Sequence, residues 1–207
     1  MPDLRVLIVT DPMCSWCWGM SPAVEEAAVE LRDEVEFDFL LGGINTHGTQ
    51  PLGEFGERHL LQIWREVRST TGQDFGFRLP EQFVYNSTLP CLAVEAVRRF
   101  MQRPPFGYLH RLQQCLFVQG RNINDRLLLG QVALEFGLRR SEFDASLEDQ
   151  ELRDIVSAQF VSSRVYGTNA LPSVLVENSA ERRLLLGGYA DAAMLVAQIR
   201  ARLALSA

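Results

Sequence analysis

Two cysteines, Cys14 and Cys17, are separated by two residues in the segment 10–19, which reads TDPMCSWCWG. A Cys-x-x-Cys pair is either a dithiol that exchanges with disulfides or half of a zinc site, and its context decides between these. The pair follows an apolar run, Leu4 to Val9, and precedes a stretch with helical patterning, Ser21 to Leu31. A pair at such a strand-to-helix junction is typical of a redox centre.

The predicted position of Cys14, at the start of a helix, favours a reactive thiolate. Unpaired amide N–H groups and the positive end of the helix dipole both stabilise a negatively charged sulfur there. Cys17 follows one turn later on the same face, within reach of a mixed disulfide formed on Cys14. We therefore expect Cys14 to be the nucleophile and Cys17 to be the resolving thiol.

Two other interpretations of the pair are a metal site and inert core cysteines. Zinc would need two more ligands, and no second paired spacing occurs among the remaining candidates, Cys91, Cys115, His47, His59 and His110. We therefore expect no bound metal. Pro12 and Gly19 on either side of the pair indicate a turn rather than a helix interior. Cys91 and Cys115 lie in apolar helical patterns and are expected to be small hydrophobic residues that activity does not need.

Several residues near the cysteines are candidates for supporting roles. Trp16 and Trp18 flank the second cysteine, where they could contact an apolar part of a substrate or simply pack in the interior. Ser15 lies between the cysteines. Asp11 is a candidate for proton transfer, with a role as a turn residue as its alternative. His47, on the loop after the second predicted strand, is either an auxiliary residue or a solvated loop histidine.

Hydrophobic periodicity predicts a β-α-β unit at the start of the chain. Residues 4–10 form a short, β-branched, apolar run that is typical of a buried strand. The segment 21–31 places its apolar residues on one helical face. Residues 35–41 alternate apolar and acidic side chains before Gly42 and Gly43, which predicts a second strand that ends in a turn.

A long helical block separates this unit from a second strand-rich segment. Apolar residues recur at helical spacing from about residue 55 to residue 165. Strand-like sequence returns at 172–177 and 182–186, with turn residues between them, and a helix is expected over 192–205.

The predicted order is thus β-α-β, helical insert, β-hairpin and helix, which makes the fold class α/β. We assign residues 1–50 and 166–207 to one domain and residues 51–165 to an inserted helical subdomain.

The composition excludes several classes of protein. The chain has 207 residues, of which 47% are hydrophobic and 22% charged, as expected for a globular protein with a substantial core. A net charge of -6 provides no basic surface for nucleic acid. We expect no membrane partner, because no apolar stretch is long enough to span a bilayer. The first residues show no secretory signal, so we expect a cytoplasmic protein whose thiols are held reduced.

The Cys-x-x-Cys segment near the start and the segment 170–174, which reads ALPSV, together resemble the DsbA-like branch of the thioredoxin superfamily. More narrowly, the chain resembles the cytoplasmic group of predicted protein-disulfide isomerases, called FrnE-like. The resemblance covers essentially the whole chain and includes Thr71-Gly72 and residues 120–125 of the insert. It implies a thioredoxin-like fold, β-α-β then β-β-α, with a large all-helical insertion.

The resemblance also implies roles for individual residues. Cys14 is then the attacking thiol, Cys17 its partner, and Leu171-Pro172 a cis-proline loop that faces them. The residues alone favour an ordinary trans proline at the start of a strand. Backbone beside a cis-proline in such proteins pairs with an extended substrate, which makes Leu171 and Pro172 substrate-binding candidates.

Two positions depart from the family pattern. The periplasmic oxidant of this family has Pro-His between its cysteines, where this chain has Ser15-Trp16, so its strongly oxidising potential does not carry over. Relatives often keep a buried acid six residues before the nucleophile, but this chain has Ile8 there. Asp11 is the candidate substitute.

The sequence therefore predicts a thiol-disulfide oxidoreductase or isomerase. Its expected partners are disulfide-containing or unfolded proteins, or small thiols. We expect no bound cofactor besides the redox-active disulfide, with glutathione as a candidate reductant. One alternative is a glutathione-dependent isomerase or transferase that acts on a small aromatic substrate, against which the retained Cys17 argues. A redox-switched chaperone or interaction module is another alternative.

Overall fold

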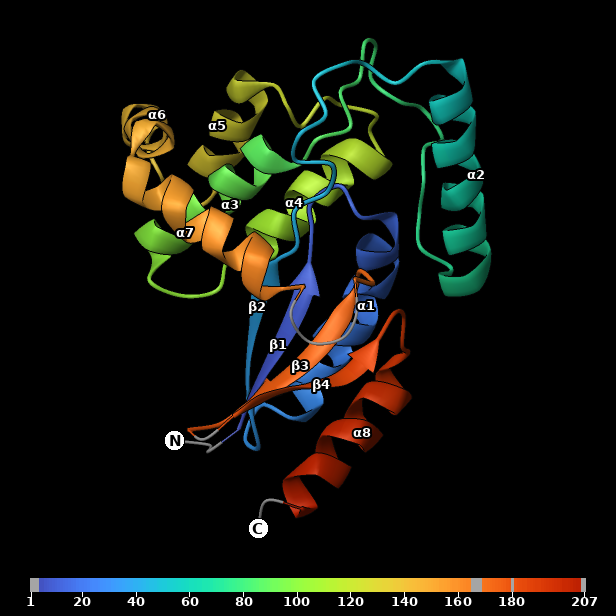
Figure 1. Ribbon diagram of the computed structural model, residues 1–207, viewed down its shortest axis with the longest axis vertical. Coiled ribbons are helices and arrows are strands. Elements are labelled where there is room, and N and C mark those ends of the chain that lie inside the picture. Colours follow the sequence, from blue (N-terminus) through green and yellow to red (C-terminus); the bar gives the residue numbers. More distant parts are fainter. Residues whose placement is uncertain (1–3, 165–168, 180, 206–207) are drawn as a thin grey trace.

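The strands form one four-stranded sheet, which lies in the lower half of the view in Figure 1. The computed structural model describes residues 4–164, 169–179 and 181–205. The strand order is β2-β1-β3-β4, in which β1 and β2 are parallel and the other neighbours are antiparallel. The strands are β1 (Arg5–Thr10), β2 (Glu36–Leu41), β3 (Ser173–Glu177) and β4 (Arg182–Gly187).

Helices α1 (Ser15–Glu30) and α8 (Ala192–Ala204) belong to the part of the chain that carries the strands. Between β2 and β3 the described residues contain six further helices, and in Figure 1 those from α3 to α7 gather at the end of the sheet to which β1 points. These six are α2 (Glu54–Thr71), α3 (Thr88–Met101), α4 (Phe106–Phe117), α5 (Arg126–Glu135), α6 (Arg140–Glu148) and α7 (Gln150–Ser162). The predicted fold class, α/β with a DsbA-like helical insertion, is confirmed.

The two faces of the sheet are buried to different extents. Val6 and Ile8 of β1 point into the main core, which includes apolar residues of α1, α4 and α8. Leu7 and Val9 point to the opposite face and form a smaller cluster with Leu175 of β3. Since successive side chains alternate across a strand, burial on both faces explains why β1 reads as a continuous apolar run.

The insert is anchored to the outer strand β2. The Arg98 guanidinium of α3 lies 2.6 Å from an Asp38 carboxylate oxygen and donates to the Phe39 carbonyl at 2.9 Å. The Leu41 amide donates to the side chain of Gln159 in α7 at 3.0 Å. These contacts satisfy edge groups that would otherwise be exposed, and they fix the insert relative to the sheet.

Strand boundaries agree with the sequence prediction to within one residue. Helix α1 begins at Ser15, directly after Cys14 as predicted, although helical patterning is recognisable only from Ser21, and Cys17 and Gly19 lie inside the helix. The prediction that Gly19 marks a turn is wrong because this glycine serves helix packing. A Cβ atom at Gly19 would lie 2.6 Å from Cγ1 of Val67 in α2. The predicted junction at residues 165 and 166 lies outside the described residues.

None of the helices in the described residues is both long and apolar enough to cross a membrane.

We predict that Gly19→Ala destabilises the protein by about 1–3 kcal/mol, because the added methyl group overpacks the contact between α1 and α2. Urea unfolding followed by circular dichroism measures this loss. Gly53→Ser at the N-cap of α2 is the control, since nothing lies within 4 Å of a Cβ atom there. Equal stability of Gly19→Ala and the unchanged protein would contradict the packing role.

Candidate active site

Cys14 is the N-cap residue of α1. Its sulfur accepts a hydrogen bond from the backbone N–H of Cys17 at 3.1 Å, which replaces a bond that the first turn of the helix lacks. Only 5% of Cys14 is exposed. The sulfur therefore lies where an amide donor and the helix dipole both favour negative charge.

Cys17 lies in the first turn of α1 and is buried. Burial raises the pKa of its thiol well above the usual range, and the neighbouring Cys14 sulfur raises the pKa further. A hydrogen bond with Thr10 acts in the opposite direction. Cys17 therefore keeps its proton near neutral pH, whereas Cys14 occupies the position suited to a thiolate.

Asp11 is fully buried in the turn between β1 and α1. One carboxylate oxygen accepts from the Met13 amide at 2.8 Å, and the other accepts from the Ser87 hydroxyl at 2.6 Å. Burial raises the pKa of Asp11 to about 6, despite the hydrogen bonds that favour its charged form. Asp11 is thus a turn residue, which was one of its two predicted roles. It is also a titratable group whose charge acts on the Cys17 thiol.

The Leu171–Pro172 loop lies at the same end of the sheet as the cysteines. Its peptide bond is cis. Ser173, the next residue, pairs with Val9 near the end of β1, which directly precedes the segment that carries Cys14. Pro172 is buried, and its carbonyl accepts from the Gly188 amide at 2.9 Å.

A hollow of about 290 Å³ adjoins this loop. Leu171 is half-buried at its edge and packs so closely on Gly42 that a Cβ atom there would lie 2.8 Å from the leucine side chain. Polar groups also line the hollow, including the exposed Arg164, which donates to the Gly43 carbonyl at 2.9 Å. An extended chain could lie here with both backbone and polar contacts.

The two tryptophans beside Cys17 differ in position. Trp18 is 3% exposed, its indole donates to the Asp74 carbonyl at 2.9 Å, and its ring stacks on Phe117. Of the two interpretations of Trp18, this environment favours packing in the interior, because partners from the insert enclose the side chain. Trp16 is half-buried, and its ring centre lies 6.0 Å from that of Tyr189. It stays a substrate-contact candidate.

The remaining residues named in the sequence analysis differ in how close they lie to Cys14 and Cys17. Ser15 is buried as the first residue of α1, next to Cys14. His47 is exposed on the loop after β2 and has no hydrogen bond or ion pair with either cysteine among the described residues. Cys91 and Cys115 are both buried. Cys91 also lies 3.5 Å from an Asp11 oxygen, and burial raises the pKa of its thiol well above the usual range.

Three residues of the insert that form hydrogen bonds with the segment 11–13, just before Cys14, could not be found from the sequence. The Tyr85 hydroxyl donates to the Met13 carbonyl at 3.1 Å, and the Gln113 side chain donates to the Asp11 carbonyl at 3.3 Å. Ser87 bonds the Asp11 carboxylate, as described above. No spacing signal links these residues to the cysteines, because they are more than 70 positions away in the chain.

No group of three or more His, Cys, Asp or Glu side chains in the described part of the chain could hold a metal ion.

A family model described as Thioredoxin matches residues 8–197. The chain belongs to the thioredoxin family. It is similar to the crystal structure of a candidate protein disulfide isomerase from Nitrosomonas europaea, with 27% identity, a TM-score of 0.91, and coverage of 99% of this chain and 100% of the other.

Cytosolic disulfide reductase DsbM from Pseudomonas aeruginosa is also similar, with 25% identity, a TM-score of 0.79, and coverage of 97% of this chain and 99% of the other. A further structure of DsbM, with GSH, has 26% identity and a TM-score of 0.76, over 96% of this chain and 98% of the other. The protein therefore has the fold of DsbA-like thiol-disulfide oxidoreductases.

Curated relatives with a similar sequence are adapter proteins. The ClpXP adapter protein SpxH of Halalkalibacterium halodurans is 23% identical over 182 residues, which cover 84% of this chain and 59% of the adapter. SpxH of Bacillus subtilis is 24% identical over 151 residues, which cover 71% of this chain and 49% of the adapter. The chain thus spans about half to three fifths of the length of these relatives.

We predict that Asp11 makes stability depend on pH. Its folded pKa of about 6 lies above the ordinary value of 3.8, so its contribution to stability is fully present below about pH 4 and is lost as pH rises through 6. The loss amounts to about 3 kcal/mol. In Asp11→Asn this dependence is absent, so the stability of the unchanged protein relative to the variant falls between these pH values.

Urea unfolding of both proteins across this pH range measures the difference. A difference that does not change with pH would contradict the raised pKa of Asp11.

Proposed function

We propose that the protein is a thiol-disulfide oxidoreductase that works through Cys14 and Cys17. The observation that carries the proposal is the hydrogen bond from the Cys17 amide to the Cys14 sulfur at the N-terminus of α1. It gives the two thiols different environments, one suited to a thiolate and one that keeps its proton. The similarity to disulfide reductases of the same fold supports this assignment.

The reaction has two exchange steps. The Cys14 thiolate attacks a substrate disulfide, forms a mixed disulfide and releases one substrate sulfur as a thiolate, which takes up a proton. Cys17 then loses its proton and attacks the Cys14 sulfur, so that the second substrate sulfur leaves. The substrate disulfide has gained two electrons, and the protein holds a Cys14–Cys17 disulfide. An external thiol, such as two molecules of glutathione, reduces it again.

Reduction or isomerisation of disulfides in the cytoplasm is the direction we propose. The similar DsbM is described as a cytosolic disulfide reductase, and one of its structures is described as with GSH. Glutathione is therefore our candidate reductant. A thiol that acts in a reduced compartment also meets its reductant at high concentration, which favours turnover in this direction.

For the substrate we propose an extended peptide segment or a small disulfide beside Leu171 and Pro172. The hollow of about 290 Å³ next to this loop supports the proposal, since it offers both backbone and polar groups to a ligand. Trp16, half-buried beside the cysteines, would add an apolar contact. We further propose that residues 51–165 act as a separate subdomain that frames this site, with residues 1–50 and 166–207 as the redox domain.

A binding role is a second candidate, because the sequence is similar to that of SpxH adapters over most of this chain. Here the dithiol would switch the affinity for a protein partner rather than turn over a substrate.

We predict that Cys14→Ser abolishes reduction of a model disulfide such as insulin in the presence of glutathione. We expect Cys17→Ser to attack but not to resolve, so that it accumulates a mixed disulfide with glutathione that mass spectrometry detects. Cys115→Ala is the matched control, because this cysteine is buried in α4 and should not affect activity beyond a modest loss of stability.

Undiminished disulfide reduction by Cys14→Ser would refute the proposed function. Binding of a partner protein that depends on the redox state, with no turnover by the unchanged protein, would favour the adapter role instead.

A further inference from the structure

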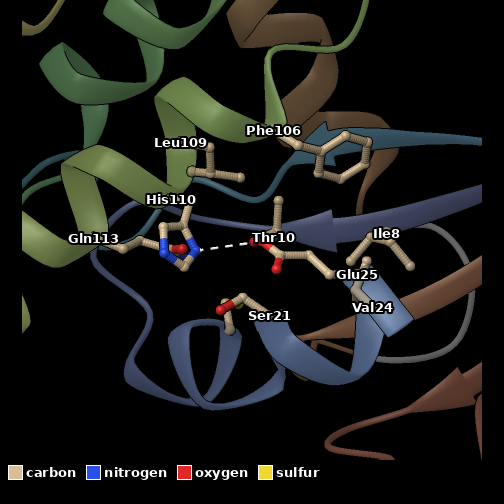
Figure 2. A pocket seen from close by; sticks show the side chains of 10 residues that line it. Ile8, Thr10, Ser21, Val24, Glu25, Phe106, Leu109, His110 and Gln113 are labelled. Atoms are coloured by element: carbon tan, nitrogen blue, oxygen red, sulfur yellow. Dashed lines mark ion pairs between the residues drawn. The ribbon is translucent and has the colours of Figure 1, made fainter. Parts of the chain in front are cut away.

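Cys17 is one of the residues that line a small pocket between α1, β1 and α4; Figure 2 shows the pocket with other residues of its lining. Its volume is about 40 Å³, which is enough for ordered water. Cys17 from α1 and Thr10 from β1 line it together with residues of α4. Much of the remaining lining is apolar, from Ile8, Val24, Phe106 and Leu109. The pocket is therefore a place where water could contact the buried resolving thiol.

Two titratable side chains besides Cys17 line this pocket in the described part of the chain. His110 of α4 and Glu25 of α1 face each other across it, with Nδ1 of the histidine 3.6 Å from a Glu25 carboxylate oxygen (Figure 2). The Nδ1 atom is itself buried and has no hydrogen-bond partner among the described residues. Glu25 is largely exposed, whereas the His110 side chain is 37% exposed. The pair thus connects the pocket to solvent.

The chemistry of Cys17 requires a proton acceptor at this position. The thiol is buried and keeps its proton near neutral pH, yet it must become a thiolate to resolve the mixed disulfide. Asp11 does not line the pocket, and its carboxylate already accepts bonds from Met13 and Ser87. Ile8 places only hydrocarbon there.

We propose that His110 and Glu25, acting through water in this pocket, take up the proton of Cys17 when it attacks the mixed disulfide. This inference rests on the proposed function. The neutral imidazole of His110 accepts the proton at Nδ1, and the adjacent Glu25 carboxylate stabilises the resulting positive charge. The Cys17 sulfur bonds to the Cys14 sulfur, the bond from Cys14 to the substrate breaks, and the departing thiolate takes up a proton from solvent. His110 then returns its proton to solvent past Glu25.

Stopped-flow reaction of the reduced protein with one equivalent of 5,5′-dithiobis(2-nitrobenzoate) separates the two steps. Attack by Cys14 releases a first coloured thiolate, and attack by Cys17 on the mixed disulfide releases a second. We expect His110→Gln and His110→Phe to slow the second release by at least about tenfold at pH 7 and to leave the first unchanged. The deficit should shrink toward pH 9, where hydroxide removes the proton, and added imidazole should restore part of the rate.

Matched control variants separate proton transfer by His110 from a structural effect of replacing its side chain. His59→Gln changes an exposed histidine of α2, and Glu26→Gln changes the neighbour of Glu25, so both should keep the rate of the second release. Glu25→Gln should slow this release less than the His110 variants do. The ring centre of Trp18 lies 4.9 Å from that of His110. Because His110→Gln retains a polar side chain beside Trp18, this variant provides the test if His110→Phe does not fold.

An unchanged second release in both His110 variants would overturn the relay, as would a deficit that is equal at every pH or insensitive to imidazole. Failure of the proposed function gives a different result, because the unchanged protein would then show no second release, or Cys17→Ser would still show one.

Discussion

The buried carboxylate of Asp11 holds together the turn on which the candidate site depends. It accepts from the Met13 amide within the turn and from Ser87, the N-cap of α3 in the insert. The backbone carbonyl of the same residue accepts from the Cys14 amide at 3.1 Å. One residue thus joins the end of β1, the start of α1 and the insert, and it fixes where the Cys14 sulfur lies. The cost is a buried carboxyl group whose pKa burial raises to about 6, despite its hydrogen bonds.

The two thiols lie in different environments because a helix N-terminus is electrostatically asymmetric. The N-cap position gives the Cys14 sulfur an amide donor, whereas Cys17 is buried in the first turn, where burial raises the pKa of its thiol more than the hydrogen bond with Thr10 lowers it. Burial therefore favours the protonated form of Cys17. Under the proposed function, removal of this proton is a necessary event of each cycle.

The sequence predicted the elements of the fold well because their signals are local. Residues 6–9 of β1 are a continuous apolar run, and the cysteine pair follows shortly after it, so strand, site and helix start could all be inferred. Gly19 was taken for a turn residue, whereas its lack of a side chain serves the contact with Val67. That contact joins segments about 50 residues apart, and no local pattern encodes it. Substrate contact and interior packing both stayed open for Trp18 for a similar reason, since Phe117 and Asp74, which enclose it, are distant in sequence.

The helical insert contributes directly to the surroundings of the two cysteines. Tyr85, Ser87 and Gln113 each bond the redox segment from the insert, and His110 reaches the pocket beside Cys17. The sheet and α1 alone would leave the Asp11 carboxylate without its shortest hydrogen bond and the pocket without a wall. Because these contacts come from α4 and from the loop that leads into α3, a shift of the insert would alter the environment of both thiols at once. The environment of the pair is therefore set by the whole fold as well as by the Cys-x-x-Cys segment itself.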